Sequence, residues 1–109
     1  MMPIPKVAIS KIELSQDEVA LLKRLLQSHS YTPALAIYVG EIINKIGDSL
    51  TIELDGMCLA VLNTTINSII EDTSMRPPDI VMLNDISYKV QQQLVARMKE
   101  ILAQAPLRP

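Results

Sequence analysis

The sequence predicts a mainly helical α+β fold, with about four helices and a short two-stranded antiparallel ribbon. The segment Ile-Glu-Leu followed by a helix-capping residue occurs twice, at residues 12–15 and 52–55. Each copy passes from alternating apolar residues, typical of a half-buried strand, to the three- and four-residue spacing of an amphipathic helix. The copies align at a constant offset over 12–28 and 52–68, which predicts a tandem strand-helix-helix repeat.

The first copy begins with an extended segment at residues 7–14. Ser15 follows, and serine is a favoured N-cap because its hydroxyl accepts a hydrogen bond from an unpaired backbone N–H of the first turn. Glu18 stands three residues later and completes a capping box. We therefore expect the first helix to run from about Gln16 to Ser28.

The second helix is expected from about Pro33 to Ile46, with Thr32 as its cap and Gly47 at its end. Proline suits the first turn, where its missing N–H leaves no helical hydrogen bond unmade. Apolar residues occupy more than one stripe of this helix, which predicts burial on most sides. Gly40 lies inside it, and close approach of another helix would give a packing reason for that glycine.

The second copy predicts a strand at residues 50–54 and a helix at about 56–72, capped by Asp55 alone. A hairpin turn at Asp55-Gly56 is the rival interpretation, because Asp-Gly between apolar runs favours a hairpin. The repeat argues against it, since the first copy has no turn pair there. If the two strands pair, four side chains should face the helices: Ile12, Leu14, Ile52 and Leu54.

Residues 73–78 are expected to form a loop, and a last helix follows from about Pro78 to Gln104. Its apolar spacing fits either one continuous helix or a helix broken near Asn84-Asp85. With 109 residues, the chain is expected to be a single domain, 1–109, with pseudo-repeat halves at about 7–47 and 48–104.

The composition disfavours several classes of protein. A formal net charge of −2 creates no field that attracts nucleic acid or an anionic membrane. Apolar runs are too short to span a membrane, residues 1–9 do not have the pattern of a signal peptide, and the one cysteine cannot form an internal disulfide. We therefore expect a cytoplasmic protein with no membrane partner.

Chemically reactive patterns are sparse. His29 and Cys58 are the only soft metal ligands, and the glycines Gly40, Gly47 and Gly56 stand too far apart for a phosphate-binding loop. Cys58 falls on the apolar face of its helix, where a thiol acts as a small apolar group. We expect no catalytic residue, no metal and no cofactor, and so predict that the protein is not an enzyme.

The remaining signal is an excess of apolar helix surface, which predicts a protein partner or self-association as a homodimer. The candidate interface residues are Tyr38, Ile42, Tyr88 and Met98. The leading hypothesis is a small non-enzymatic interaction or oligomerisation domain, of the kind found in adaptors, antitoxins or immunity proteins.

The order of the predicted strand and helices indicates an alternative function. Residues 11–46, and more weakly 51–102, resemble in order and length a subunit of the ribbon-helix-helix DNA-binding family. That resemblance implies a transcriptional regulator whose ribbon enters the major groove, and it places Lys11, Glu13, Thr51 and Glu53 on the outward face. Two glutamates facing a phosphate-lined groove disfavour nucleic acid as a partner, because lysine and arginine supply most contacts to phosphate.

Overall fold

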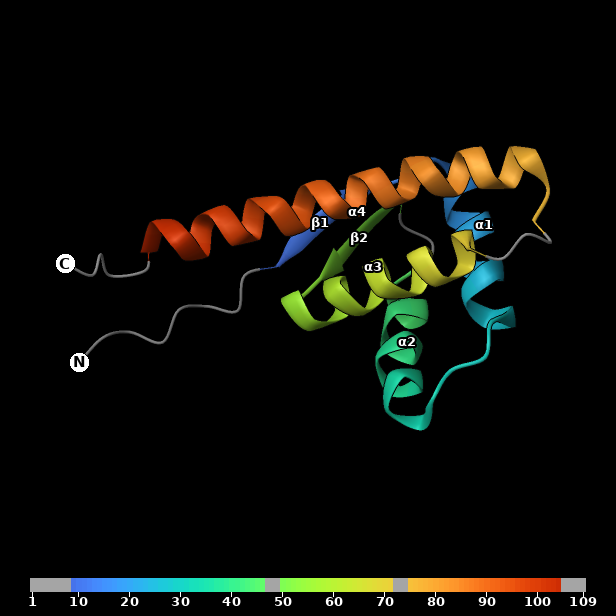
Figure 1. Ribbon diagram of the computed structural model, residues 1–109, viewed down its shortest axis with the longest axis horizontal. Coiled ribbons are helices and arrows are strands. Elements are labelled where there is room, and N and C mark those ends of the chain that lie inside the picture. The colour runs from blue at the N-terminus through green and yellow to red at the C-terminus, as the bar shows by residue number, and fades with distance from the viewer. Residues whose placement is uncertain (1–8, 47–49, 72–74, 105–109) are drawn as a thin grey trace.

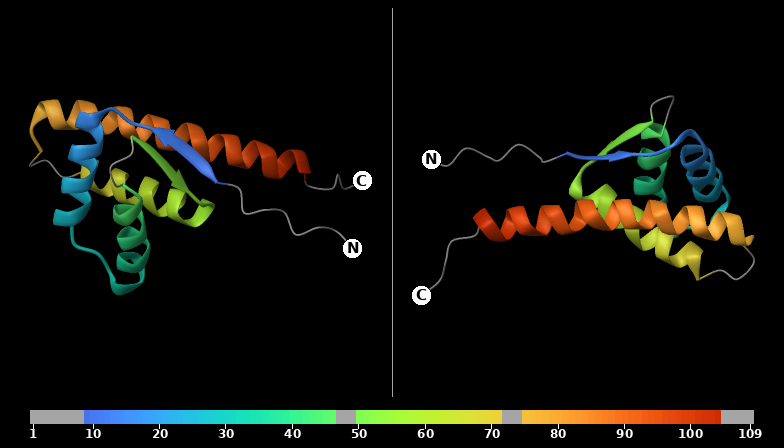
Figure 2. Two further views of the ribbon diagram at one scale, coloured as in Figure 1. Left: turned by 180° about the vertical axis from the view of Figure 1, so that it is seen from behind. Right: turned by 90° about the horizontal axis from the view of Figure 1, so that it is seen from above.

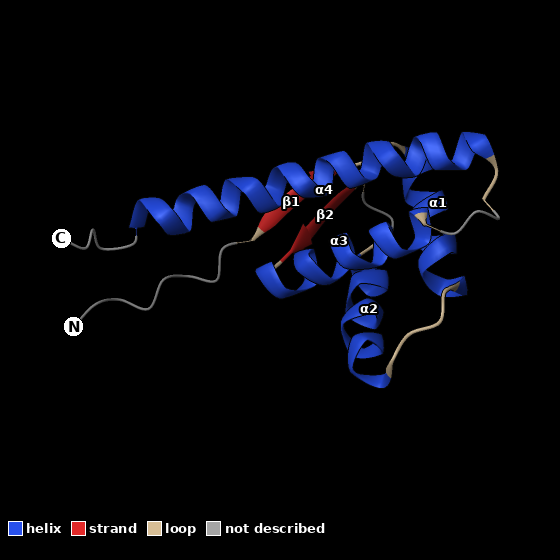
Figure 3. Cartoon of the chain, in the orientation of Figure 1, coloured by secondary structure: helices blue, strands red, loops and turns tan. Residues whose placement is uncertain are grey.

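The computed structural model describes residues 9–46, 50–71 and 75–104, which form four helices and one two-stranded antiparallel sheet (Figure 1). The predicted fold class is confirmed, and Figure 3 shows helices as most of the chain. Strand-helix-helix occurs twice in order, but the halves differ in helix length, and the tandem repeat stays a prediction. The elements are β1 Ser10–Glu13, α1 Gln16–Ser28, α2 Pro33–Lys45, β2 Thr51–Leu54, α3 Gly56–Ile70 and α4 Pro77–Gln104.

The two strands pair as a short antiparallel ribbon in which Ile12 stands opposite Ile52. These residues occupy matching places in the two copies of Ile-Glu-Leu. Ile12, Leu14, Ile52 and Leu54 are all buried, so the prediction that they face inward is confirmed. A two-stranded ribbon is marginally stable alone, and these four side chains anchor it to the helices.

The predicted caps of α1 and α3 are present. Ser15 Oγ accepts a hydrogen bond from the Glu18 backbone N–H at 3.2 Å, and Glu18 Oε1 accepts one from the Ser15 N–H at 2.8 Å. Asp55 Oδ1 accepts a hydrogen bond from the Cys58 N–H at 2.8 Å, which lowers the pKa of Asp55 below its ordinary value. Because α3 begins at Gly56, the hairpin interpretation of Asp55-Gly56 was wrong.

The core is aliphatic, and α3 lies at its centre, in contact with α4, α2 and β2 (Figure 1). All six elements contribute side chains to it. Its largest fully buried residues include Leu22, Leu26, Ile42, Ile52, Leu54, Leu59, Leu62, Ile66, Leu83 and Ile86. The repeated strand-to-helix segments therefore supply much of one shared interior.

The α2 helix is more exposed than its composition predicted. Within α2 only Val39 and Ile42 are buried, while Ile37 is 70% exposed. Gly40 is exposed, and a Cβ added there would have no atom of another residue within 4 Å. Burial on most sides and close helix approach at Gly40 were therefore wrong predictions. The physical reason is that α2 lies at the edge and packs one face on α3. Gly47 lies outside the described residues.

Gly40→Ala is expected to raise the free energy of unfolding by about 0.5–1 kcal/mol. Alanine restricts the unfolded chain and suits a helix interior, and the open space at Gly40 adds no clash. Gly56→Ala is the comparison, because its Cβ would lie 2.8 Å from Arg97 Nη2 and would displace that side chain. Urea denaturation should show a gain only for Gly40→Ala; no gain would contradict the edge position of α2.

The last helix is continuous from Pro77 to Gln104 and is not broken near Asn84-Asp85. It begins one residue earlier than expected, so Pro77 and Pro78 belong to its first turn instead of the preceding loop. The Arg76 carbonyl accepts hydrogen bonds from the backbone N–H groups of Asp79 and Ile80, which starts the helix. Figure 2 shows the C-terminal end of α4 extending past the other three helices.

Candidate functional site

The α4 helix carries most of the exposed large apolar side chains. Ten such residues are exposed in the described ranges, and six lie on α4: Val81, Tyr88, Val95, Met98, Ile101 and Leu102. Four recur every seven residues, and we call them the outer stripe: Val81, Tyr88, Val95 and Leu102, with exposed fractions of 63%, 63%, 49% and 70%. Seven residues make nearly two helical turns, so they share one face.

The opposite face of α4 is buried. Leu83, Ile86 and Val90 are fully inaccessible and lie about half a turn round the helix from the outer stripe. The chain therefore uses one apolar face of α4 for its own core and leaves the other open. Toward the C-terminus the core-facing side of α4 is exposed as well: every residue from 98 to 103 is exposed.

Two open hollows adjoin the outer stripe. The first has a volume of about 480 Å³, lies between the start of α1 and α4, and is lined in part by Asp17, Val81, Asp85 and Tyr88. The second has a volume of about 410 Å³ and is lined by α4 alone, through Tyr88, Gln91, Gln92, Val95, Ala96 and Lys99. The stripe is therefore indented, and its hollows can receive side chains of a partner.

A partly buried ion pair joins α1 to α4 beside the first hollow. Glu18 Oε1 accepts a hydrogen bond from Lys89 Nζ at 2.7 Å, and the Glu18 side chain is only 9% exposed. Burial alone would raise the pKa of Glu18, but hydrogen bonds from Lys89 and Ser15 outweigh it and hold the pKa below its ordinary 4.5. The pair therefore connects α1 to the part of α4 that carries Val81 and Tyr88.

Lys89→Met is expected to lower the free energy of unfolding at pH 7 by about 1–2 kcal/mol, because it leaves the Glu18 carboxylate buried without its cation. The stabilisation by Glu18 exists above the ordinary carboxyl pKa and is lost as pH falls through the lower folded-state pKa. The difference from wild type should therefore shrink in acid. Urea denaturation at pH 7 and pH 3 measures it, with Lys23→Met on the exposed face of α1 as control. An equal loss at both pH values would contradict the pair's role.

The predicted partner residues do not share one surface. Tyr88 and Met98 are exposed on α4, at 63% and 61%. Tyr38 is partly buried and packs against the core, and Ile42 is fully buried in it. The structure thus brings Tyr88 and Met98 to one helix and places Ile42 where a partner cannot reach it without rearrangement of α2. That these residues form an interface stays a prediction.

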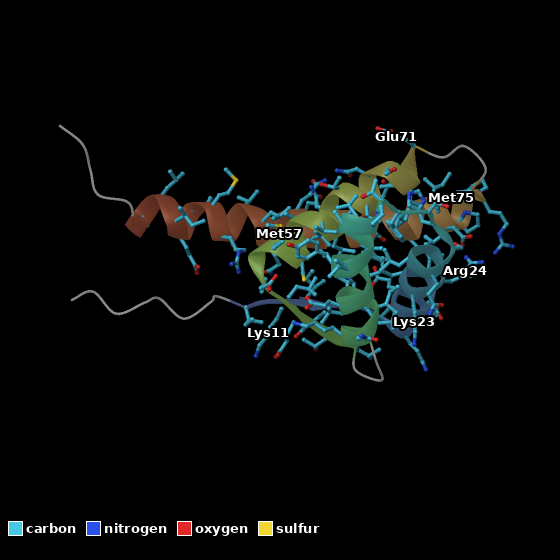
Figure 4. All side chains as sticks on the ribbon, turned by 90° about the horizontal axis from the view of Figure 1, so that it is seen from below. Lys11, Lys23, Arg24, Met57, Glu71 and Met75 are labelled. Atoms are coloured by element: carbon cyan, nitrogen blue, oxygen red, sulfur yellow. The ribbon has the colours of Figure 1, made fainter. Side chains whose placement is uncertain are left out.

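The ribbon residues named for the DNA-binding alternative do share a face. Lys11, Glu13 and Glu53 are exposed and Thr51 is partly exposed. Lys11 Nζ lies 3.7 Å from Glu53 Oε1, so the one lysine among these four residues is already paired with a carboxylate. Figure 4 shows Lys11 on the ribbon, well apart from Lys23 and Arg24 on α1. These four residues thus carry a net negative charge, which opposes contact with phosphate.

The two soft metal ligands of the sequence, Cys58 and His29, make contacts that support the fold. Cys58 is buried at 1% exposure, and its thiol donates a hydrogen bond to Glu41 Oε2 at 3.3 Å. Burial, together with this carboxylate, raises the pKa of Cys58 to about 12, which suppresses the thiolate. His29 ends α1, and its ring lies edge-on to Tyr31. No cluster of three or more His, Cys, Asp or Glu residues occurs in the described ranges.

Sequence reasoning missed Val81 and Val95 as surface residues. The signal was present in the printed sequence as a seven-residue recurrence of apolar side chains from 81 to 102. It was obscured because the core-facing residues of the same helix have helical spacing too, so the apolar positions merged into one long pattern.

Among the described residues, no helix is both long enough and apolar enough to cross a membrane. Comparisons with known proteins found no matching family model, no similar curated protein and no similar solved structure.

Proposed function

We propose that this chain is a non-enzymatic protein-interaction domain whose contact surface is the outer stripe of α4. The observation that carries the proposal is the concentration of exposed large apolar residues on this one helix, six of ten in the described ranges. Exposed apolar groups scattered singly are ordinary, whereas an aligned series on one face is typical of a binding surface.

The C-terminal turns of α4 support the same proposal. Residues 98–103 form helix although all of them are exposed, and they include Met98, Ile101 and Leu102. Helices depend mainly on packing of an apolar face for their stability, and no described element of the chain covers these turns. A partner that covers Met98 and Leu102 supplies the missing contact.

Site-specific photo-crosslinking tests the proposal. A photoactivatable amino acid is placed at Met98, which lies beside the outer stripe between Val95 and Leu102 and is 61% exposed. In a control protein it is placed at Ile37 on α2, which is 70% exposed. Irradiation of cells that make the protein should give a discrete covalent adduct from position 98, with a second copy or with another protein, and none from position 37. If position 98 gives no discrete adduct, the outer stripe is not an interaction surface.

A further inference from the structure

We infer that the partner of the outer stripe is a second copy of this chain, bound with the two α4 helices antiparallel about a two-fold axis near residue 93. This inference rests on the proposed function and names its partner. In this register the second copy's Leu102 lies opposite Asn84, its Met98 opposite Tyr88 and its Val95 opposite Gln91.

The hollows and the apolar side chains match in this register. A side chain of one packed helix enters a hole formed by residues i, i+3, i+4 and i+7 of the other. The second copy's Val95 enters the hole formed by Tyr88, Gln91, Gln92 and Val95, and these four residues line the second hollow. Its Leu102 enters the hole that contains Val81, Asp85 and Tyr88, which line the first hollow.

The charges beside the stripe also select the antiparallel direction. Asp85 and Lys99 are exposed at the edge of the stripe, and neither has an ion-pair partner within the described part of the chain. In the antiparallel register Asp85 lies about two residues, roughly 3 Å along the axis, from the second copy's Lys99, and symmetry makes this pair twice. In a parallel pair Asp85 and the second copy's Lys99 would lie 14 residues, roughly 21 Å, apart along the axis and could not form an ion pair.

The two chains have room to associate in this way. The outer stripe lies on the opposite side of α4 from Leu83, Ile86 and Val90, so the bodies of the two chains lie on opposite sides of the helix pair. The seam from Val81 to Leu102 extends about 32 Å along the helix. Asn84 and Gln91 are polar positions within it, which fix register and lower affinity, so we expect a weak, reversible dimer.

Charge reversal tests the pairing by sedimentation velocity across a range of concentrations. Lys99→Glu and Asp85→Lys should each weaken the dimer roughly tenfold or more, because each turns two attractive pairs into repulsive ones. An equimolar mixture of the two variants should restore wild-type affinity, since both cross-pairs are then attractive. Lys23→Glu on α1 is the charge-matched control and should leave the dimer unchanged.

Disulfide trapping tests the direction of the helices, in a Cys58→Ser background. Antiparallel helices place the two copies of residue 102 about 27 Å apart, so Leu102→Cys alone should not cross-link. The double variant Asn84→Cys/Leu102→Cys should give a covalent dimer on mild oxidation. A covalent dimer formed by Leu102→Cys alone would overturn the antiparallel arrangement. A dimer whose affinity is unchanged by Lys99→Glu would overturn it as well.

The two proposals can fail separately. A wild-type chain that stays monomeric up to about 1 mM, where even a weak specific dimer forms, overturns the self-pairing inference. The proposed function then still holds if photo-crosslinking at Met98 captures a different protein, and fails if Met98 captures nothing. Apart from Cys58, which is buried, all of the substituted positions are exposed. Circular dichroism of each variant, and of Cys58→Ser alone, checks that the fold is retained.

Discussion

Ile66→Ala should lower the free energy of unfolding by about 3–5 kcal/mol, a large part of the stability of a chain of this size. Ile66 is completely buried on α3, the helix that packs against α4, α2 and β2. Removing three carbons there loses their transfer free energy and leaves a cavity that neighbouring side chains fill only in part. Urea denaturation with matched m-values measures the loss.

Ile37→Ala is the matched control for this prediction. It makes the same chemical change in a helix, but Ile37 is 70% exposed, so we expect a change within about 0.5 kcal/mol. Similar losses in the two variants would mean that the interior is not organised around α3. The comparison therefore tests the position of the core independently of any partner.

Cys58 should react with a thiol reagent about a thousandfold more slowly in the native chain than in the unfolded chain at pH 8. The thiolate is the reactive form, and the rise in pKa from an ordinary 9.0 to about 12 lowers its fraction by that factor. Kinetics with a chromogenic disulfide in the presence and absence of urea measure the ratio. Native labelling as fast as unfolded labelling would contradict the burial of Cys58.

The same pKa shift predicts a loss of stability in alkali. The unfolded chain releases the Cys58 proton first as pH rises above 9, so the contribution of the thiol to folding declines between pH 9 and about pH 12. By pH 10.5 this decline should reach about 2 kcal/mol. Denaturation at pH 8 and pH 10.5 measures it against Cys58→Ala, which lacks the titrating group; an unchanged difference between the two proteins would contradict the prediction.

Local sequence signals predicted most of the fold because they act over a few residues. Ser15 and Glu18 form a capping box that depends only on their spacing of three, and it is present. The alternation in Ile12-Glu13-Leu14 predicted which side chains face inward, and Ile12 and Leu14 are buried. The start of α3 at Gly56 also followed from its local cap, Asp55.

Long-range packing limited what could be predicted of the candidate site. Apolar composition alone does not distinguish a residue that another helix covers from one that no element reaches. Ile42 and Ile37 lie on the same helix, yet one is fully buried and the other 70% exposed, because α2 packs one face on α3. The prediction that another helix packs closely against Gly40 was wrong for the same reason.

The sequence by itself determined the helices, the two strands, their caps and the inward faces of the ribbon, because hydrophobic spacing and capping chemistry are local. Only the tertiary structure decided that α4 continues past the other helices and that its outer stripe stays uncovered. The physical reason is that exposure depends on which elements meet in space, and a helix with two apolar faces does not encode in its own residues which face the chain will bury.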